Sequence, residues 1–285
     1  MKLFTSLFFF LFLINNNLSA QFADDTKIDL HLNLLPGDTY LYSVSMNQNI
    51  VQEIMGEPLE INQQIKTDYS YLVESNDGDL FKIKVNYERI QLTFDAPQGK
   101  VEYDSEQSSN NSSLAAINDL IGKPFYVLMN TKGKISKIEG FNELTKNLNL
   151  TDPIKQFLTD SALIQSLTMD IYSDQSVEMG DSWNKSKTIN LANLKLQSNL
   201  TYTLEGTSED LAWLNVTGDI SAINNDPNFE MEITATQNGT IETDINSGMI
   251  SSGNIKIEMD ATLKSQGFDI PMKIISEIKT EGRKL

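Results

Sequence analysis

Long runs in which apolar and polar side chains alternate are the feature that most constrains the fold of this chain. Two of them place apolar residues at Tyr40, Tyr42, Val44 and Met46, and at Ile255, Ile257, Met259, Ala261 and Leu263. Successive side chains of a β-strand point to opposite faces, so each run predicts a strand with one apolar and one polar face. Short turns join neighbouring runs, which favours antiparallel pairing. We therefore expect a mainly β (α+β) protein built on a long antiparallel sheet.

A change of phase within one run indicates that this sheet is curved. Its apolar positions are Phe81, Ile83, Val85 and Tyr87, and then Ile90, Leu92 and Phe94 in the opposite phase. Alternation cannot change phase unless one residue is left unpaired, so we predict a β-bulge at Glu88-Arg89. The whole run would extend about 43 Å at ~3.3 Å per residue, longer than a flat sheet in such a domain usually needs. The expected architecture is a curved sheet or half-barrel.

Helical spacing replaces alternation in the middle of the chain. After a capping Thr151-Asp152-Pro153, the segment up to Asp170 has an apolar stripe made of Ile154, Phe157, Leu158, Ile164 and Leu167. This stripe predicts a helix that packs against the sheet. Shorter helices are expected at 114–121 and 142–150. A central helical block at 142–171 therefore divides a single β-rich domain, 21–285, into two halves at 28–140 and 177–285.

The two halves begin with the same motif, a glycine followed by aspartate, a hydroxyl residue and an aromatic residue. The copies are Gly37-Asp38-Thr39-Tyr40 and Gly180-Asp181-Ser182-Trp183. Glycine tolerates a positive φ, and the aspartate can accept a hydrogen bond from the turn backbone. We interpret both copies as structural turns that lead into half-buried strands. A further strand is expected at 28–34, before the first turn.

The N-terminus predicts export. Lys2 precedes an apolar stretch from Leu3 to Ile14, and Leu18-Ser19-Ala20 ends in small residues, as in a secretory signal peptide. We predict a signal peptide at 1–20 and a periplasmic or extracellular location. The chain has no cysteine, so neither disulfide bonds nor the lipid-modified cysteine of a bacterial lipoprotein is expected. The apolar stretch is shorter than the ~20 residues that span a bilayer, so no transmembrane segment is expected.

The charge of the chain argues against nucleic-acid binding. There are 39 acidic and 22 basic residues, for a net charge of −17. Phosphate backbones would be repelled, and the sequence contains no basic cluster that could make phosphate contacts. The acidic residues are scattered over strands and turns, a pattern that favours solubility.

Few residues have the chemistry of a catalytic or metal site. His31 is the only histidine, no Gly-x-Ser-x-Gly turn presents a serine nucleophile, and Asp77-Gly78-Asp79 does not continue into a calcium-binding loop. We expect no enzymatic activity, no cofactor and no metal. Two alternatives stay open: an acid-only hydrolase, for which Asp38 and Asp181 are the pair to inspect, and a sugar-stacking platform formed by Trp183 and Trp213.

Three segments carry a resemblance to a known family. Leu35–Tyr40, Asn130–Gly140 and Val177–Trp183, in this order, resemble a family of uncharacterised exported bacterial β-rich proteins, a domain of unknown function. That resemblance would cover nearly the whole exported chain, and it implies no established activity. More distantly, long antiparallel strands interrupted by a helical block are similar to the half-barrels of lipoprotein carriers. This second likeness is one of architecture.

The leading functional hypothesis is non-enzymatic binding of a lipid or another apolar or amphipathic ligand between a concave sheet and the central helices. The residues predicted to line such a site are Tyr42, Tyr69, Tyr71, Phe81 and Phe157. Core packing explains the same residues equally well. The alternative is an envelope or surface module that meets a protein partner without a small ligand. A closed apolar cavity would favour the first hypothesis, and a large exposed apolar patch would favour the second.

Overall fold

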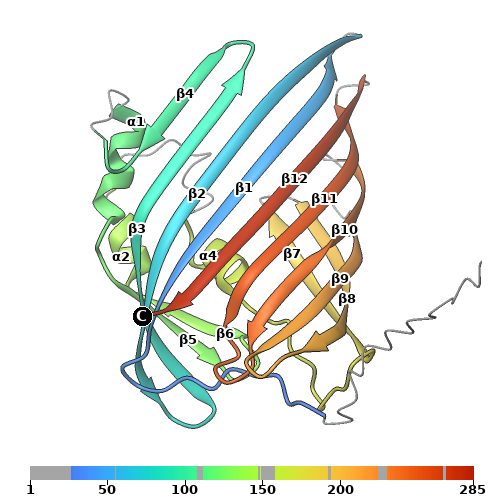
Figure 1. Ribbon diagram of the computed structural model, residues 1–285. Coiled ribbons are helices and arrows are strands. Elements are labelled where there is room, and N and C mark those ends of the chain that lie inside the picture. Colours follow the sequence, from blue (N-terminus) through green and yellow to red (C-terminus); the bar gives the residue numbers. More distant parts are fainter. Residues whose placement is uncertain are drawn as a thin grey trace, which may run out of the picture.

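The computed structural model describes residues 27–54, 56–107, 112–146, 148, 158–191, 194–223, 230–265 and 268–285. Its strands form one twelve-stranded antiparallel sheet in the order β6-β5-β3-β2-β1-β12-β11-β10-β9-β8-β7, with β4 paired to β3 (Figure 1). The strands are β1 Thr39–Ile54, β2 Glu57–Asn76, β3 Leu80–Ala96, β4 Gly99–Asp104, β5 Phe125–Asn130, β6 Ile135–Glu139, β7 Ser182–Leu191, β8 Leu194–Thr207, β9 Leu211–Ala222, β10 Glu230–Asp244, β11 Ile250–Ser265 and β12 Phe268–Lys284. The predicted fold class is confirmed.

The sheet is strongly curved, as predicted. In Figure 1, β7, β8 and β9 lie behind β12, β11 and β10, and the helices lie on the concave side. These helices are short: α1 Ser112–Ala115, a 3-10 turn at Ala116–Leu120, α2 Phe141–Thr145 and α4 Asp160–Leu167. The strand order ends at β6 and β7, which do not pair with each other in the described residues. The sheet is therefore open and does not close into a barrel.

Both halves of the sequence contribute to this one sheet. Strands β1 to β6 come from the first half and β7 to β12 from the second, and pairing of β1 with β12 joins them. The predicted bulge in β3 is confirmed: Asp68 pairs with Arg89, but Tyr69 pairs with Tyr87, so Glu88 has no partner. The extra residue restores the apolar phase to the concave face and bends the strand.

The strand predicted at 28–34 is wrong. The segment is extended, and the alternating residues Leu30, Leu32 and Leu34 are fully buried, but its backbone pairs with no single strand. The amide of Leu32 donates to Thr131 O at 2.7 Å, and that of Asn33 donates to Ser247 O at 2.9 Å. An extended chain that crosses the lower end of the sheet alternates in burial just as a strand does, although it forms no ladder.

The helix predicted up to Asp170 is shorter than expected. Helix α4 ends at Leu167, and Met169 then donates its amide hydrogen to Gly133 O at 2.9 Å, in the turn between β5 and β6. The N-terminal cap is Thr159, whose side chain accepts from the amide of Ala162. The expected cap at 151–153 and Phe157, like the signal peptide at 1–20, lie outside the described residues.

The core is largest at the lower end of the concave face, where the N-terminal segment and the helices cover the sheet. Its aromatic members form a chain of ring contacts from Tyr42 through Tyr71, Tyr69, Tyr87 and Phe125 to Phe141, with centroids 5.1 to 6.1 Å apart. A second, smaller cluster contains Leu196, Ile220, Ile233, Ala235 and Ala261. It lies higher on the concave face, where β8 to β11 curve away from the front of the sheet.

The ion pair between β3 and β4 predicts a pH dependence of stability. Arg89 donates to both carboxylate oxygens of Asp104, at 3.1 and 2.7 Å, and this lowers the pKa of Asp104 to about 2. The folded-state pKa lies below the unfolded value of about 3.9. The contribution of this ion pair to the free energy of unfolding is therefore fully present above about pH 4, and it is lost as the pH falls toward about 2.

Asp104→Asn is expected to flatten the free energy of unfolding in that pH window, as measured by urea unfolding at a series of pH values. Asp79→Asn, in the exposed turn between β2 and β3, is the matched control. Equal slopes for wild type and Asp104→Asn between about pH 4 and pH 2 would contradict the assignment.

Candidate functional site on the concave face

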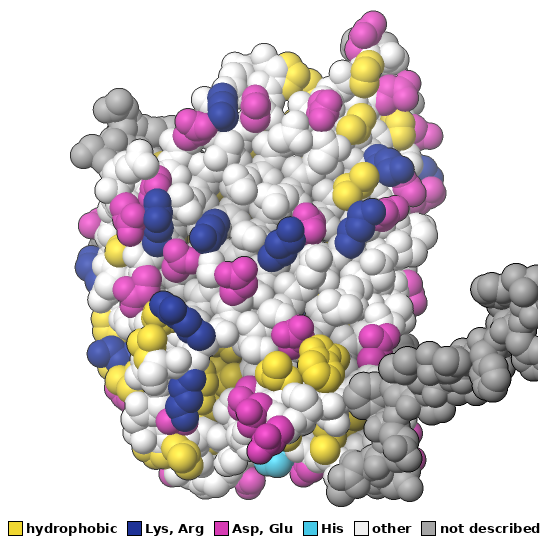
Figure 2. All heavy atoms as spheres, in the orientation of Figure 1, with side chains coloured by type: hydrophobic (Ala, Val, Ile, Leu, Met, Phe, Trp, Pro, Cys, Tyr) yellow, Lys and Arg dark blue, Asp and Glu magenta, His cyan; other side chains and the backbone are white. Residues whose placement is uncertain are grey.

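The two faces of the sheet differ sharply in chemistry. On the outer face, Figure 2 shows mainly uncharged polar surface crossed by rows of lysines and acidic residues. In β1 this face is formed by Ser43, Ser45, Asn47 and Asn49. Asn49 Nδ2 donates to Glu60 at 2.7 Å and to Asn62 at 2.9 Å, so the outer polar groups are bonded across strands. A face of this kind suits contact with water.

The upper part of the concave face is apolar but only half-buried. We call the upper inner face the inward-facing residues toward the β1–β2 hairpin, namely Met46, Ile50, Ile61, Ile65, Leu92, Phe94, Ile257, Met259, Met272 and Ile274. All of them retain exposed surface, and Phe94 is 36% exposed, whereas at the lower end Val73 and Phe81 are each 1% exposed. The described part of the chain thus leaves an apolar concave surface incompletely covered.

Pairing aligns one continuous row of inner residues across the sheet. It starts at Lys187 on β7 and Ser198 on β8. It continues through what we call the apolar row, Ile220, Ala235, Met259, Ile274, Ile50 and Ile61, on β9, β10, β11, β12, β1 and β2. A neighbouring row carries polar groups, where Gln48 donates to Ser276 at 2.9 Å. Ile220 and Ala235 of the apolar row are buried in the second cluster, whereas its other four members are half-buried. Those four give the concave face apolar surface beside a few placed polar groups, as ligand sites have.

Charge is nearly absent from this face. Apart from Glu57 at a hairpin tip and Lys284 at the end of β12, which is bound to Asp38 at 2.7 Å, pairing places only Lys185 and Lys187 there among the charged residues of the described strands. Lys185 is bound to Asp170 at 3.1 Å and to Asp174 at 3.6 Å. No carboxylate of the described residues lies within 4 Å of the ammonium group of Lys187.

Lys187 lies on the inner side of β7, in the same phase as Trp183 and Lys185. It is exposed, yet desolvation by the surrounding protein lowers the pKa of its ammonium group, an effect that Asp170 opposes.

Four of the predicted lining residues lie on the concave face but at its lower end. Tyr42, Tyr71 and Phe81 are buried in the core, and the Tyr42 hydroxyl donates to Ile250 O at 2.8 Å. Tyr69 is half-buried, and burial raises its pKa to about 12. Phe157 is outside the described residues. The residues of the upper inner face and Lys187 were missed, although the alternation itself contains them.

The repeated motif forms the same turn twice. The amide of Leu35 donates to Asp38 Oδ2 at 3.2 Å, and Gly37, with φ of 96°, donates to Val73 O. In the second copy the amide of Glu178 donates to Asp181 Oδ2 at 3.0 Å, and Gly180, with φ of 92°, donates to Leu204 O. Each copy thus ties its turn to the strand that pairs with the one it starts.

The geometry gives no support to the acid-only alternative at Asp38 and Asp181. Each carboxylate binds its own turn, and Asp38 is also bound to Lys284 at 2.7 Å. Burial would raise the pKa of Asp38, but Lys284, the Leu35 amide and Tyr40 together lower it. A general acid requires the opposite shift. In the described residues no three histidine, aspartate or glutamate side chains are grouped as metal ligands.

The two tryptophans do not form a platform. Trp183 lies on the concave side, stacks on Tyr202 with centroids 6.0 Å apart and donates to Ile171 O at 2.8 Å. Trp213 lies on the opposite face of β9, beside Gly206 of β8. The sugar-stacking alternative is therefore wrong for Trp183 and Trp213.

The single histidine, His31, is 38% exposed in its side chain and lies 3.4 Å from the carboxylate of Asp29.

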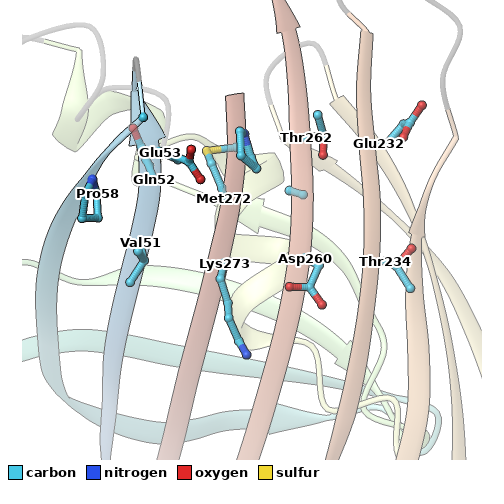
Figure 3. A pocket seen from close by; sticks show the side chains of 13 residues that line it. Val51, Gln52, Glu53, Pro58, Glu232, Thr234, Asp260, Thr262, Met272 and Lys273 are labelled. Atoms are coloured by element: carbon cyan, nitrogen blue, oxygen red, sulfur yellow. The ribbon is translucent and has the colours of Figure 1, made fainter. Parts of the chain in front are cut away.

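A hollow lies at the upper ends of β1, β10, β11 and β12 (Figure 3). It has a volume of about 620 Å³, and its charged lining residues are Glu53, Glu232, Asp260 and Lys273. Pairing places Lys273 and Asp260 on the outer face of the sheet. Acidic side chains dominate this hollow, so it is less suited to an apolar ligand than the concave face.

The chain is similar in fold to part of lipovitellin. A structure of lipovitellin matches with a TM-score of 0.51 at 13% identity over 88% of this chain, which spans 25% of the lipovitellin chain. An outer membrane channel from Pseudomonas putida F1 matches with a TM-score of 0.27 at 7% identity, covering 88% of this chain and 97% of the channel. No curated protein matches the chain.

The described helices include none long and apolar enough to cross a membrane.

At the level of sequence, residues 78–250 match the model of a family described as "Family of unknown function (DUF6263)". This match confirms the expected resemblance to a domain of unknown function. With more than half of its length matched, the chain belongs to this family.

Proposed function

We propose that this protein is a non-enzymatic binding protein that holds an apolar or amphipathic ligand against its upper inner face. One observation carries the proposal: the residues of the upper inner face are apolar yet only half-buried on a concave surface, while the outer face is mainly polar. Exposed apolar surface is costly in water at about 25 cal/mol per Å², so a ligand that covers it would be stabilised there.

The likeness to lipovitellin supports this proposal through the fold. The matching structure concerns lipid-protein interactions in lipovitellin. At 13% identity the likeness concerns the fold alone. The argument for a ligand of the present chain therefore depends on the residues of its own concave face. Export through the signal peptide at 1–20 belongs to the same proposal, because an exported binding protein would meet its ligand outside the cytoplasm.

The interaction-module alternative has less support. It requires an exposed apolar patch that a protein surface can reach. The half-buried apolar residues of the upper inner face lie on the concave side of the sheet, and the outer face is mainly polar. Two of the large apolar residues that are exposed elsewhere, Leu35 and Met179, lie in the two equivalent turns. Their positions are explained by the turn and need no protein partner.

Native mass spectrometry of the full chain, purified without detergent, tests the proposal. We expect a discrete mass adduct that disappears after organic extraction, with the ligand recovered in the organic phase. A binding surface of this kind retains its ligand when the apolar contact is large. If only the bare chain appears, and neither laurate nor dodecanol added in excess forms a complex, the proposal fails.

A further inference from the structure

The row of inner residues that starts at β7 has a charged end and an apolar end. Lys187 lies at one end, on an edge strand, and the apolar row extends from there across six strands. At ~4.8 Å between strands the apolar row is about 24 Å long. One leaflet of a bilayer has about half of the ~30 Å hydrocarbon thickness, so a single acyl chain fits within this length.

Ser198, the strand partner of Lys187, is an independent sign of a missing polar contact. It is 1% exposed, and its hydroxyl has no hydrogen-bond partner among the residues that the structure describes. A buried hydroxyl without a partner costs free energy, and most such groups in proteins are bonded. Directly opposed residues have Cβ atoms about 5 Å apart, so an acceptor bound by Lys187 is within reach of this hydroxyl.

The charges around Lys187 leave it available. Asp170 is the acidic residue whose charge opposes the lowering of its pKa, and Asp170 is already bound to Lys185 at 3.1 Å. The chain as a whole has a net charge of −17. Lys187 thus has no ion pair among the described residues and lies on a mainly apolar face of an acidic protein. Such a cation attracts an anion locally, although the rest of the surface repels it.

We propose that the ligand is a single-chain amphiphile with a carboxylate head group, such as a long-chain fatty acid. In this arrangement the ammonium group of Lys187 and the hydroxyl of Ser198 bind the carboxylate. The acyl chain passes over Ile220 and Ala235, which are buried in the second cluster, and lies against the half-buried residues of the row, Met259, Ile274, Ile50 and Ile61. This inference rests on the proposed function, because it requires the concave face to bind an apolar chain. It adds the class of the ligand, the position of its head and its direction on the sheet.

The test compares two ligands that differ only in the head group, laurate and dodecanol, by displacement of the fluorescent probe N-phenylnaphthylamine from the full chain. Lys187→Met keeps the length of the side chain and removes the charge. We expect it to raise the Kd of laurate roughly tenfold and that of dodecanol less than about twofold. Lys187→Arg should keep the Kd of laurate within about threefold, because it keeps the charge.

Two further variants separate the head-group contact from general effects. Lys195→Met removes an exposed lysine from the outer face of the adjoining strand β8, and both affinities should stay at wild-type values. Ser198→Ala should weaken laurate binding about threefold without lowering the thermal midpoint, since the hydroxyl has no partner in the ligand-free protein. A drop in thermal midpoint would instead show that Ser198 has a structural role and would remove it from the site.

The outcomes distinguish the two proposals. If wild type binds dodecanol and laurate but Lys187→Met changes both affinities equally, or neither, the head-group assignment is overturned and apolar binding stands. If wild type binds neither ligand and does not take up the probe, the proposed function itself is overturned. Preferential loss of laurate in Lys187→Met, with wild-type behaviour of Lys195→Met, supports the inference.

Discussion

Replacing Gly248 by alanine is expected to lower the free energy of unfolding by roughly 3 kcal/mol or more. Gly248 lies between β10 and β11 with φ of 74°, a conformation that disfavours any residue with a Cβ atom. A Cβ there would lie 2.1 Å from the carbonyl oxygen of His31 and 2.6 Å from its carbonyl carbon. The contact is with backbone, so no side-chain rotation relieves it.

The segment around His31 has little freedom to move away. The amides of the next two residues, Leu32 and Asn33, donate to Thr131 O and Ser247 O. These hydrogen bonds hold the backbone that follows His31 in place. The carbonyl of Gly248 also accepts from the hydroxyl of Tyr172 at 2.7 Å, and Tyr172 is fully buried. This turn joins the N-terminal segment, the segment after α4 and the sheet.

Gly78→Ala is the matched control for Gly248→Ala. Gly78 also has a positive φ, 88°, but a Cβ at this position would meet no atom within 4 Å. Its expected loss is about 1 kcal/mol, from backbone strain alone. Urea unfolding with an unchanged m-value gives the comparison. Equal losses for the two variants would contradict the predicted clash between a Cβ at position 248 and the backbone of His31.

Local patterns in the sequence predicted most of the sheet, for a physical reason. Alternation has a period of two residues in any strand, so the strands could be found without knowing their partners. The bulge at Glu88 was predictable on the same ground, because the change of phase is written in β3 itself. Strand order and curvature follow from pairing between β1 and β12, which are far apart in the sequence.

The errors arose where a distant contact decides the local structure. Residues 28–34 alternate like a strand, but their backbone partners are Thr131, Val177 and Ser247, which no local pattern reveals. The end of α4 is similarly set by Gly133, which accepts from the amide of Met169. In both places the side-chain pattern was interpreted correctly as burial, and the hydrogen-bond partner was unknown.

The candidate site was predictable as a face but not as a position. Alternation assigns Tyr42 and Ile50 to the same side of β1, yet only the three-dimensional structure shows that Tyr42 is covered and Ile50 is half-exposed. Lys187 gave a local signal, because it shares the phase of Trp183 and Ile189 in β7. A lysine in an apolar phase is unusual enough to mark a position for inspection.

The second large effect concerns ligand binding, and it compares two adjacent isoleucines of β12. Ile274 belongs to the apolar row, whereas Ile275 faces outward and pairs with Asn49 and Glu258. Both side chains are half-buried. Ile274→Glu places a carboxylate where an apolar chain would lie, and covering that charge without a partner is unfavourable. We expect the Kd of the neutral ligand dodecanol to rise roughly 100-fold, which corresponds to about 2.7 kcal/mol.

Ile275→Glu adds the same charge one residue away on the other face, so it controls for the charge of the chain and for its effect on stability. Thermal unfolding of both variants accompanies the binding measurement. The central claim is tested most directly by the Kd of dodecanol for wild type and these two variants. The account predicts a loss confined to Ile274→Glu. Equal affinities for all three proteins, or an equal loss in both variants, would contradict binding on the concave face.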